Sequence, residues 1–112
     1  MIRWLIILLV LLIVGCKGVY TPEDCAGEID KNVELWGECY NIAETDTLIL
    51  YDNQLTGEIP SEIGNLTNLT WLYLYYNQLT GEIPQEVCDL IESNNLFMNN
   101  ILTGNNLINT CE

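Results

Sequence analysis

The sequence predicts a short solenoid, in which similar coils of chain lie side by side and each contributes one strand to a parallel β-sheet. The first observation is a repeat: residues 53–60 recur, residue for residue, as residues 77–84. The second is a Leu-x-Leu pattern at the same spacing, at residues 48–50 and 72–74. The third is alternation: from residue 71 to 75, leucines alternate with aromatic side chains, which is the period of a β-strand.

A third, incomplete copy follows the two good ones. Leu96 and Met98 keep the repeat spacing from Leu72 and Leu74, but the Leu-Thr-Gly triplet 102–104 comes earlier than that spacing requires, and no Ile-Pro follows it. End repeats are usually atypical. We therefore expect residues 93–112 to form a degenerate repeat and a C-terminal cap, with truncation of a longer repeat protein as the alternative.

The repeat resembles the plant-type leucine-rich repeat, which occurs in plant receptor ectodomains and in bacterial surface proteins. Residues 45–92 match its pattern LxxLxLxxNxLTGxIPxxIGNLTNL as two repeats, and residues 93–112 match it weakly. The resemblance implies a leucine-rich-repeat solenoid, a short right-handed β/α superhelix. Its parallel β-strands would form the concave face, with turns and 3-10 segments on the convex side.

Several repeated residues have predicted structural roles. We expect the amides of Asn53 and Asn77 to bond backbone groups that the turn leaves unpaired, as a ladder between coils, so that alanine at either position destabilises the fold. The glycines should supply unusual backbone conformations and the prolines should begin a short helical turn. These residues are Gly57, Gly81, Pro60 and Pro84.

The N-terminus predicts an export signal. An uninterrupted apolar run from residue 4 to residue 14 follows Arg3. Such a run rises about 16 Å as a helix, whereas a bilayer span needs roughly 20 residues. It therefore fits the apolar part of a signal peptide. The alternatives are an uncut membrane anchor and a buried core helix.

Residues 13–16, Ile-Val-Gly-Cys, resemble the lipobox of bacterial lipoproteins, in which the cysteine is acylated and becomes the new N-terminus. The resemblance implies that residues 1–15 are a lipoprotein signal peptide and that Cys16 carries lipid. The protein would then be lipid-anchored to a bacterial membrane in the cell envelope. Lys17 replaces the aspartate that resembles an inner-membrane retention signal, which favours the outer membrane. If the lipobox is not used, we expect secretion.

Five cysteines become four once Cys16 is assigned to lipid. Four cysteines allow three connectivities, and exported proteins meet an oxidising compartment. We favour the pairs Cys25–Cys39 and Cys88–Cys111, because each pair flanks one end of the repeats. A metal site is disfavoured, since the chain has no CxxC pair and no histidine.

Charge and composition exclude several classes of function. The net charge of −13 excludes a nucleic-acid binder and leaves lipid as the link to a membrane. The absence of histidine and the repeat-equivalent, solvated positions of the glutamates argue against an enzyme, and no cofactor is expected. Asp30, Asn32 and Glu34 start like a calcium loop but lack its glycine and final glutamate. Residues 16–44 are therefore expected to be an acidic, irregular lead-in and cap.

The concave face carries the functional prediction. Its outward positions should stack in rows at the repeat spacing, and aromatic side chains are enriched in binding hot spots. The predicted binding residues are Ile49, Tyr51, Trp71, Tyr73, Tyr75, Tyr76 and Phe97. We expect a cell-envelope module that binds a protein or a glycan. The face covers on the order of 200 Å² against about 800 Å² for a stable interface, so binding should be weak or multivalent. The alternatives are that these residues merely suit strands, in a structural surface protein or a decayed fragment without a ligand.

Overall fold

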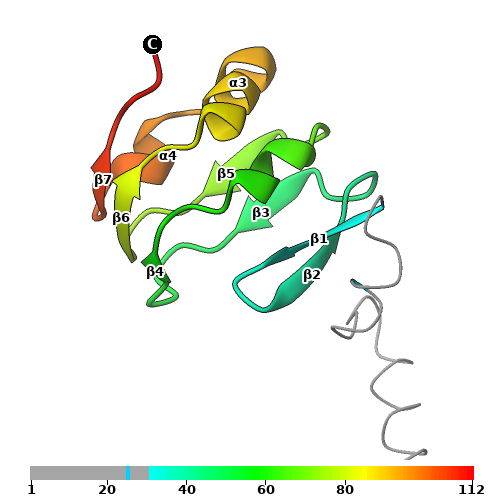
Figure 1. Ribbon diagram of the computed structural model, residues 1–112, viewed down its shortest axis with the longest axis horizontal. Coiled ribbons are helices and arrows are strands. Elements are labelled where there is room, and N and C mark those ends of the chain that lie inside the picture. Colours follow the sequence, from blue (N-terminus) through cyan, green and yellow to red (C-terminus); the bar gives the residue numbers. More distant parts are fainter. Residues whose placement is uncertain (1–24, 26–30) are drawn as a thin grey trace, which may run out of the picture.

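The computed structural model describes Cys25 and residues 31–112 (Figure 1); the predicted signal peptide and Cys16 lie outside the described residues. The elements follow one another as β1 (Asn32–Leu35), β2 (Glu38–Asn41), β3 (Thr47–Ile49), β4 (Thr56–Gly57), η1 (Ser61–Asn65), β5 (Trp71–Tyr73), β6 (Gln78–Glu82), α3 (Gln85–Asn94), α4 (Asn99–Leu102) and β7 (Asn106–Ile108). Within the described ranges, no helix has the length and apolar character needed to cross a membrane.

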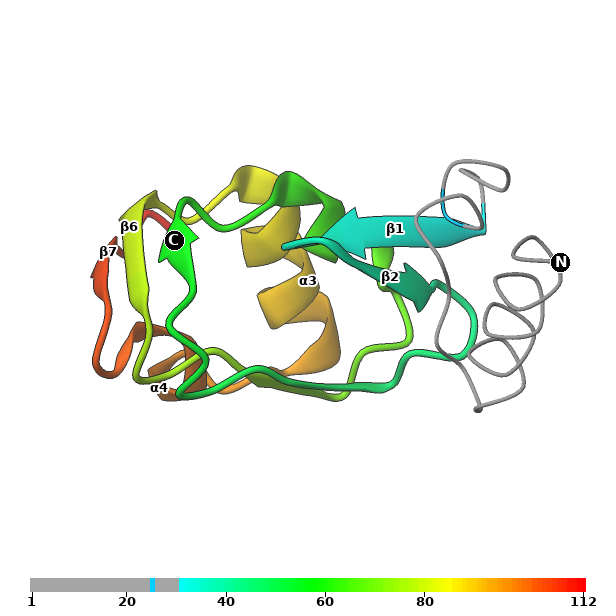
Figure 2. The same ribbon diagram turned by 90° about the horizontal axis from the view of Figure 1, so that it is seen from below.

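Parallel strands join equivalent positions of the two repeats, as the sequence predicts. β3 pairs with β5 in a parallel register that places Thr47 opposite Trp71 and Ile49 opposite Tyr73, and both pairs keep the repeat spacing. A second parallel sheet has the order β4-β6-β7. The hairpin β1–β2 and strand β7 lie at opposite ends of the fold (Figures 1 and 2).

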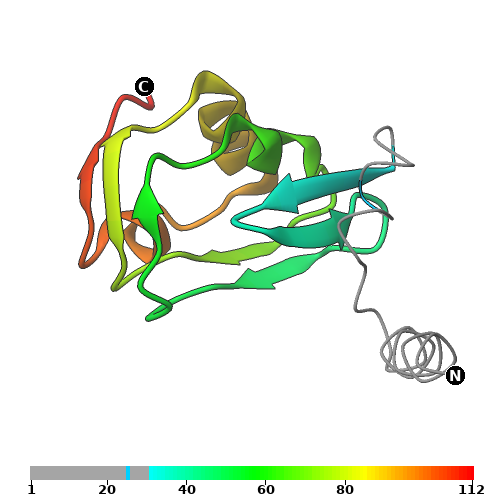
Figure 3. The same ribbon diagram turned by 60° about the horizontal axis from the view of Figure 1, so that its bottom comes forward.

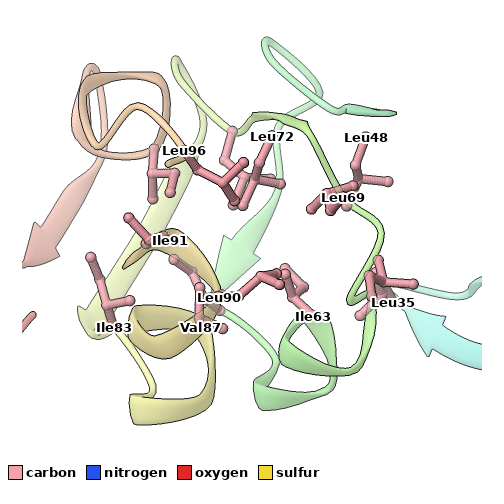
Figure 4. Close-up of a cluster of buried hydrophobic side chains, with 14 of the residues drawn as sticks. Leu35, Leu48, Ile63, Leu69, Leu72, Ile83, Val87, Leu90, Ile91 and Leu96 are labelled. Atoms are coloured by element: carbon pink, nitrogen blue, oxygen red, sulfur yellow. The ribbon is translucent and has the colours of Figure 1, made fainter. Parts of the chain in front are cut away.

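The core lies between these sheets and the helices. In Figure 3, β3 and β5 run along one side of the coils, β4, β6 and β7 along a second, and η1 and α3 along a third. The inward leucines of both repeats and the apolar residues of the helices meet in this interior (Figure 4). Leu69, Leu74 and Leu79 are fully buried. Full burial of a leucine stabilises by roughly 1.5–3 kcal/mol, so the stacked rows hold the coils together.

The return path of the two repeats differs between them. Pro60 precedes the 3-10 helix η1 and Pro84 precedes α3, so both prolines begin helical segments as predicted. The second segment is an α-helix of 10 residues, which corrects the expectation of 3-10 segments and turns alone on this side. Its sequence explains the change: Gly64 of the first repeat is replaced by Cys88 in the second, which removes a residue of low helix propensity.

Residues 32–41 form an antiparallel hairpin, so the expectation of an irregular lead-in is wrong for this part of the chain. Trp36 and Gly37 make the two-residue turn, and both have a positive φ, of 47° and 81°. Val33 and Leu35 are buried in the core while Glu34 between them is exposed. The strand therefore covers the N-terminal side of the first coil and contacts η1.

The third coil departs from the predicted alignment. Leu96 is buried as expected, but it belongs to no strand, and the short helix α4 follows it. β7 pairs with β6 by placing Thr80 opposite Asn106, a longer offset than the one that joins β3 to β5, so the triplet 102–104 is not the counterpart of the one at 79–81. Leu96 and Met98 keep the spacing of a repeat strand, but residues 99–102 form the helix α4 directly after them.

One of the two favoured disulfides is formed. Cys88 of α3 is bonded to Cys111, which ties the end of the chain to the helix. The predicted bond between Cys25 and Cys39 is wrong in this structure, because Cys25 is a buried free thiol. The backbone pairing of β1 with β2, in which Cys39 lies opposite Glu34, closes the N-terminal hairpin without that bond.

Candidate functional site

The side chain of Asn77 links the chain segments that follow strands β3 and β5. Its Oδ1 accepts the backbone N–H groups of Asn53 (2.9 Å) and Leu55 (3.0 Å). Its Nδ2 donates to the carbonyls of Leu50 (2.8 Å) and Leu74 (2.9 Å). The amide thus joins the chain just after both strands, and the predicted ladder is confirmed at this residue.

Asn53 and Asn105 show where the sequence interpretation was incomplete. Asn53 is exposed, and its amide donates only to the nearby carbonyl of Tyr51, so its predicted ladder role is wrong. No coil precedes its own that could supply the N–H donors. Asn105 instead forms the next bridge: it accepts from Leu79 N–H and donates to the carbonyls of Leu74 and Ile101. Its irregular spacing from Asn77 hid it in the sequence.

The predicted binding residues gather on one surface, which we call the aromatic face. It comprises Ile49, Tyr51, Trp71, Tyr73, Tyr75, Tyr76 and Phe97. Phe97 is 64% exposed, Tyr76 60% and Trp71 45%, whereas Tyr73 and Tyr75 are half-buried. The leucines between them, such as Leu72 and Leu74, point into the core, as the alternation predicted.

Six aromatic rings of this face form one continuous cluster. Tyr51 and Tyr75, at equivalent positions of the two repeats, stack with ring centroids 4.7 Å apart and an angle of 3° between the planes. Trp71 lies parallel to Tyr73 at 6.0 Å and close to parallel with Phe97 at 6.4 Å. Tyr75 also meets the rings of Tyr73 at 6.1 Å and Tyr76 at 5.4 Å in edge-on geometry. Every ring therefore has an aromatic neighbour that holds it in place.

The backbone conformation at two equivalent positions sets the end of the aromatic face. Asp52 and Tyr76 have φ values of 53° and 55°, a left-handed conformation that is uncommon for residues other than glycine. Tyr76 also packs against Gly104 of the third coil, where a Cβ atom would collide with the Tyr76 ring. The need for glycine there could not be seen in the sequence, because the third copy is out of register.

Electrostatics keep the aromatic face neutral and its surroundings acidic. Desolvation raises the pKa of the Tyr75 phenol, and the nearby phenols of Tyr51, Tyr73 and Tyr76 raise it further, so the Tyr75 hydroxyl stays protonated. Asp46 and Asp52 are exposed just outside the two ends of the β3 chain segment. The sequence has no Lys, Arg or His from residue 32 to residue 112. An anionic ligand would therefore find no positive partner on this part of the chain.

The third coil contributes no strand to the aromatic face. Asn95 ends α3 in a left-handed conformation and Asn99 begins α4, so neither extends the sheet. Phe97 reaches the aromatic face from the connecting segment instead. Ile49, Trp71 and Tyr73 thus lie in β3 and β5, whereas Tyr51, Tyr75 and Tyr76 follow these strands and Phe97 lies between α3 and α4.

The other surfaces of the described residues have fewer features of a functional site. A cavity of about 250 Å³ lies between the hairpin and the first coil, lined by Leu35, Trp36, Glu38, Tyr40, Leu50, Asn53 and Leu55. Among the described residues, no three His, Cys, Asp or Glu side chains gather closely enough to hold a metal ion. The repeated glutamates at 58, 62, 82 and 86 are all exposed, without the burial that tunes a catalytic carboxylate.

Comparison with known families agrees with the repeat. The family model for the Leucine Rich Repeat matches residues 45–66 and 68–90. These stretches contain β3, β5 and the residues of the Asn77 ladder. No curated protein and no solved structure matches the chain.

Proposed function

Because the chain carries two leucine-rich repeats, which commonly mediate protein binding and are typically non-enzymatic, we propose that it is a binding module of the cell envelope. Its aromatic face would recognise a protein partner, and its coils would form a short right-handed solenoid. The observation that carries the proposal is the continuous cluster of six rings. Tyrosine and tryptophan dominate binding hot spots in protein interfaces.

The packing of the rings supports binding, because it lowers the entropy lost on association. Immobilising a flexible side chain at an interface costs about 0.5–1.5 kcal/mol. Tyr75 already touches three other rings, and Trp71 touches two. Strand propensity alone explains Trp71 and Tyr73 of β5. It does not explain Tyr51, Tyr76 and Phe97, which lie outside both strands and are exposed.

The same packing favours a protein over a glycan. A sugar ring stacks on an open aromatic face, but Tyr51 and Tyr75 cover each other's inner faces. The cluster offers ring edges, hydroxyl groups and aliphatic surface at Ile49, which suit the mixed side chains of a protein. The acidic surroundings favour a partner that is neutral or basic where it meets the aromatic face.

Attachment to a membrane is the second part of the proposal. The apolar run before the Ile-Val-Gly-Cys sequence supports acylation at Cys16 and a place in the cell envelope, with the outer membrane favoured. Many anchored copies would compensate for the small area of each face through avidity.

The test compares two double variants of the full chain. Tyr73→Ser with Tyr75→Ser removes the centre of the aromatic face, whereas Thr56→Ala with Thr80→Ala changes two exposed, repeat-equivalent positions of the other sheet. Intact expressing cells are treated with a cross-linker, and cross-linked proteins are identified by mass spectrometry. A partner lost only with the tyrosine variant, at unchanged melting temperature, supports the proposal. If no partner depends on these tyrosines, the chain is a structural surface protein or a fragment without a ligand.

A further inference from the structure

Residues 93–111, at the C-terminal end of the chain, are uncharged in a strongly acidic protein. No charged residue occurs between Glu92 and Glu112. With 17% charged residues in the whole chain, about three would be expected there. The third coil, α4 and β7 all fall within this stretch. The segment itself therefore adds no charge to a contact between two copies, although Glu82 of β6 lies opposite Ile108.

Strand β7 presents an unprotected edge at this end. It is the outer strand of the β4-β6-β7 sheet, and its outer side faces away from the fold in Figures 1 and 3. The carbonyl of Ile108 accepts the N–H of Ile83 in the chain that follows β6. Since alternate residues of a strand bond to opposite sides, the N–H and C=O of Leu107 point outward. Edge strands are usually blunted by a charge, a proline, a bulge or shortness. β7 has three residues, and Asn106–Ile108 carries neither charge nor proline.

Apolar side chains accompany this edge. Ile108 is 59% exposed on β7. Phe97, which also belongs to the third coil, is 64% exposed. Leu107 is half-buried against the core. The C-terminal end thus combines unpaired backbone N–H and C=O groups with exposed apolar side chains. Both features favour pairing with another strand.

The opposite end of the fold does not offer a matching surface. The β1–β2 hairpin packs against η1 there and contributes Val33 and Leu35 to the core. It also exposes Glu34 and Glu38. A head-to-tail stack would have to pair β7 with β3 or β4, the outer strands of the first coil, beside this acidic hairpin. Joining like ends through a two-fold axis is the commonest symmetry of protein oligomers and avoids that contact.

We propose that the β7 edge pairs with the β7 edge of a second copy of this chain. The strands run antiparallel around an axis at Leu107, so that Asn106 of one copy lies opposite Ile108 of the other. The two three-stranded sheets become one continuous sheet across the dimer. Antiparallel pairing reverses the strand direction, so the aromatic side of one copy lies beside the helical side of the other. The dimer therefore carries two aromatic faces on opposite sides, which suits bivalent binding.

The experiment measures self-association of the full chain in non-ionic detergent by analytical ultracentrifugation. The wild type should show a monomer–dimer equilibrium. Ile108→Glu places a new charge at each of two symmetric positions and should raise the dimer dissociation constant about tenfold. The control is Gln54→Glu, because Gln54 is exposed and lies outside both the aromatic face and the proposed contact. It should leave the dissociation constant unchanged.

A charge pair tests the register. In Asn106→Lys with Ile108→Glu, each lysine would face a glutamate of the other copy, and dimerisation should return to within about threefold of the wild type. A wild type that stays monomeric at every concentration, a dimer indifferent to Ile108→Glu, or a loss that the double variant does not restore would each overturn the proposal. Both variants change exposed residues, and circular dichroism melting verifies that they fold.

Discussion

Replacing Asn77 with alanine should lower the free energy of unfolding by about 3 kcal/mol. The side chain is 7% exposed and holds four backbone groups, three of them in the first coil. The alanine side chain has no donor or acceptor for any of these groups. The variant therefore tests whether one amide holds the two coils together.

The magnitude follows from the partners that remain. The Leu74 carbonyl keeps a second donor, the Asn105 amide at 2.8 Å, so it loses little. The N–H groups of Asn53 and Leu55 and the carbonyl of Leu50 have no substitute among the hydrogen bonds of the structure. Each lost bond to a partly buried group costs about 1 kcal/mol, which gives about 3 kcal/mol for the three. A domain of this size should then melt about 12–24 °C lower.

The matched control is Asn53→Ala, the identical residue one repeat earlier. Asn53 is exposed and its amide makes one bond, at 3.3 Å to the Tyr51 carbonyl, so its loss should cost less than about 1 kcal/mol. Urea unfolding of both full-length variants, followed by circular dichroism, measures the difference. Equal losses for the two variants would refute the reasoning, because they would show that the asparagine acts within its own repeat and not between coils.

Three further outcomes are expected. Reduction of Cys88–Cys111, which closes a loop with a sequence separation of 23, should lower the unfolding free energy by about 3 kcal/mol, and a double alanine variant should no longer respond to reductant in urea unfolding. Gly64→Ala should cost about 1–3 kcal/mol in the same assay, because the new Cβ would lie 2.7 Å from the Glu86 Cβ and 2.8 Å from its backbone oxygen; an unchanged melting curve would contradict this packing. Burial, and then the nearby carboxylate of Glu38, raises the pKa of the Tyr40 phenol above its usual value of 10.0. The protonated phenol therefore contributes stability that is complete below pH 10.0 and is lost as the pH rises through the folded-state pKa. A plot of unfolding free energy against pH for Tyr40→Phe should lack this alkaline loss.

The sequence predicted the arrangement of the two good repeats because their spacing is uniform. A constant offset predicts which residues become neighbours, and the pairs Thr47–Trp71 and Ile49–Tyr73 follow it. In the other sheet, β4 meets β6 in a shorter register that places Thr56 opposite Gln78. The same offset brought Tyr51 and Tyr75 together at 4.7 Å. Equivalent positions in the repeat thus predicted the contact between Tyr51 and Tyr75. The edge-on contacts of Tyr75 with Tyr73 and Tyr76 depend on side-chain packing, which the repeat spacing does not predict.

The two ends of the fold could not be predicted in the same way. At the C-terminal end, the helical turn of α4 shifts the register, and β7 meets β6 at a longer offset than the one between β3 and β5. At the N-terminal end, Val33 and Leu35 have the alternation of a strand, but their acidic neighbours suggested a solvated segment. Burial of the alternating apolar side chains against η1 outweighed the charge on the exposed face, because Glu34 stays in water.

The unequal asparagines show why identical repeats do not have identical energetics. Asn77 is buried because a coil lies on each side of it, and its amide bonds the strand ends of two coils. Asn53 has the same neighbours in sequence but no repeat before it, and its amide is left in solvent. Asn105, in a copy that sequence alignment places out of register, still forms the next bridge. The stabilising unit is therefore the contact between coils, and a chain with so few coils depends on what covers its first coil and what pairs with its last one.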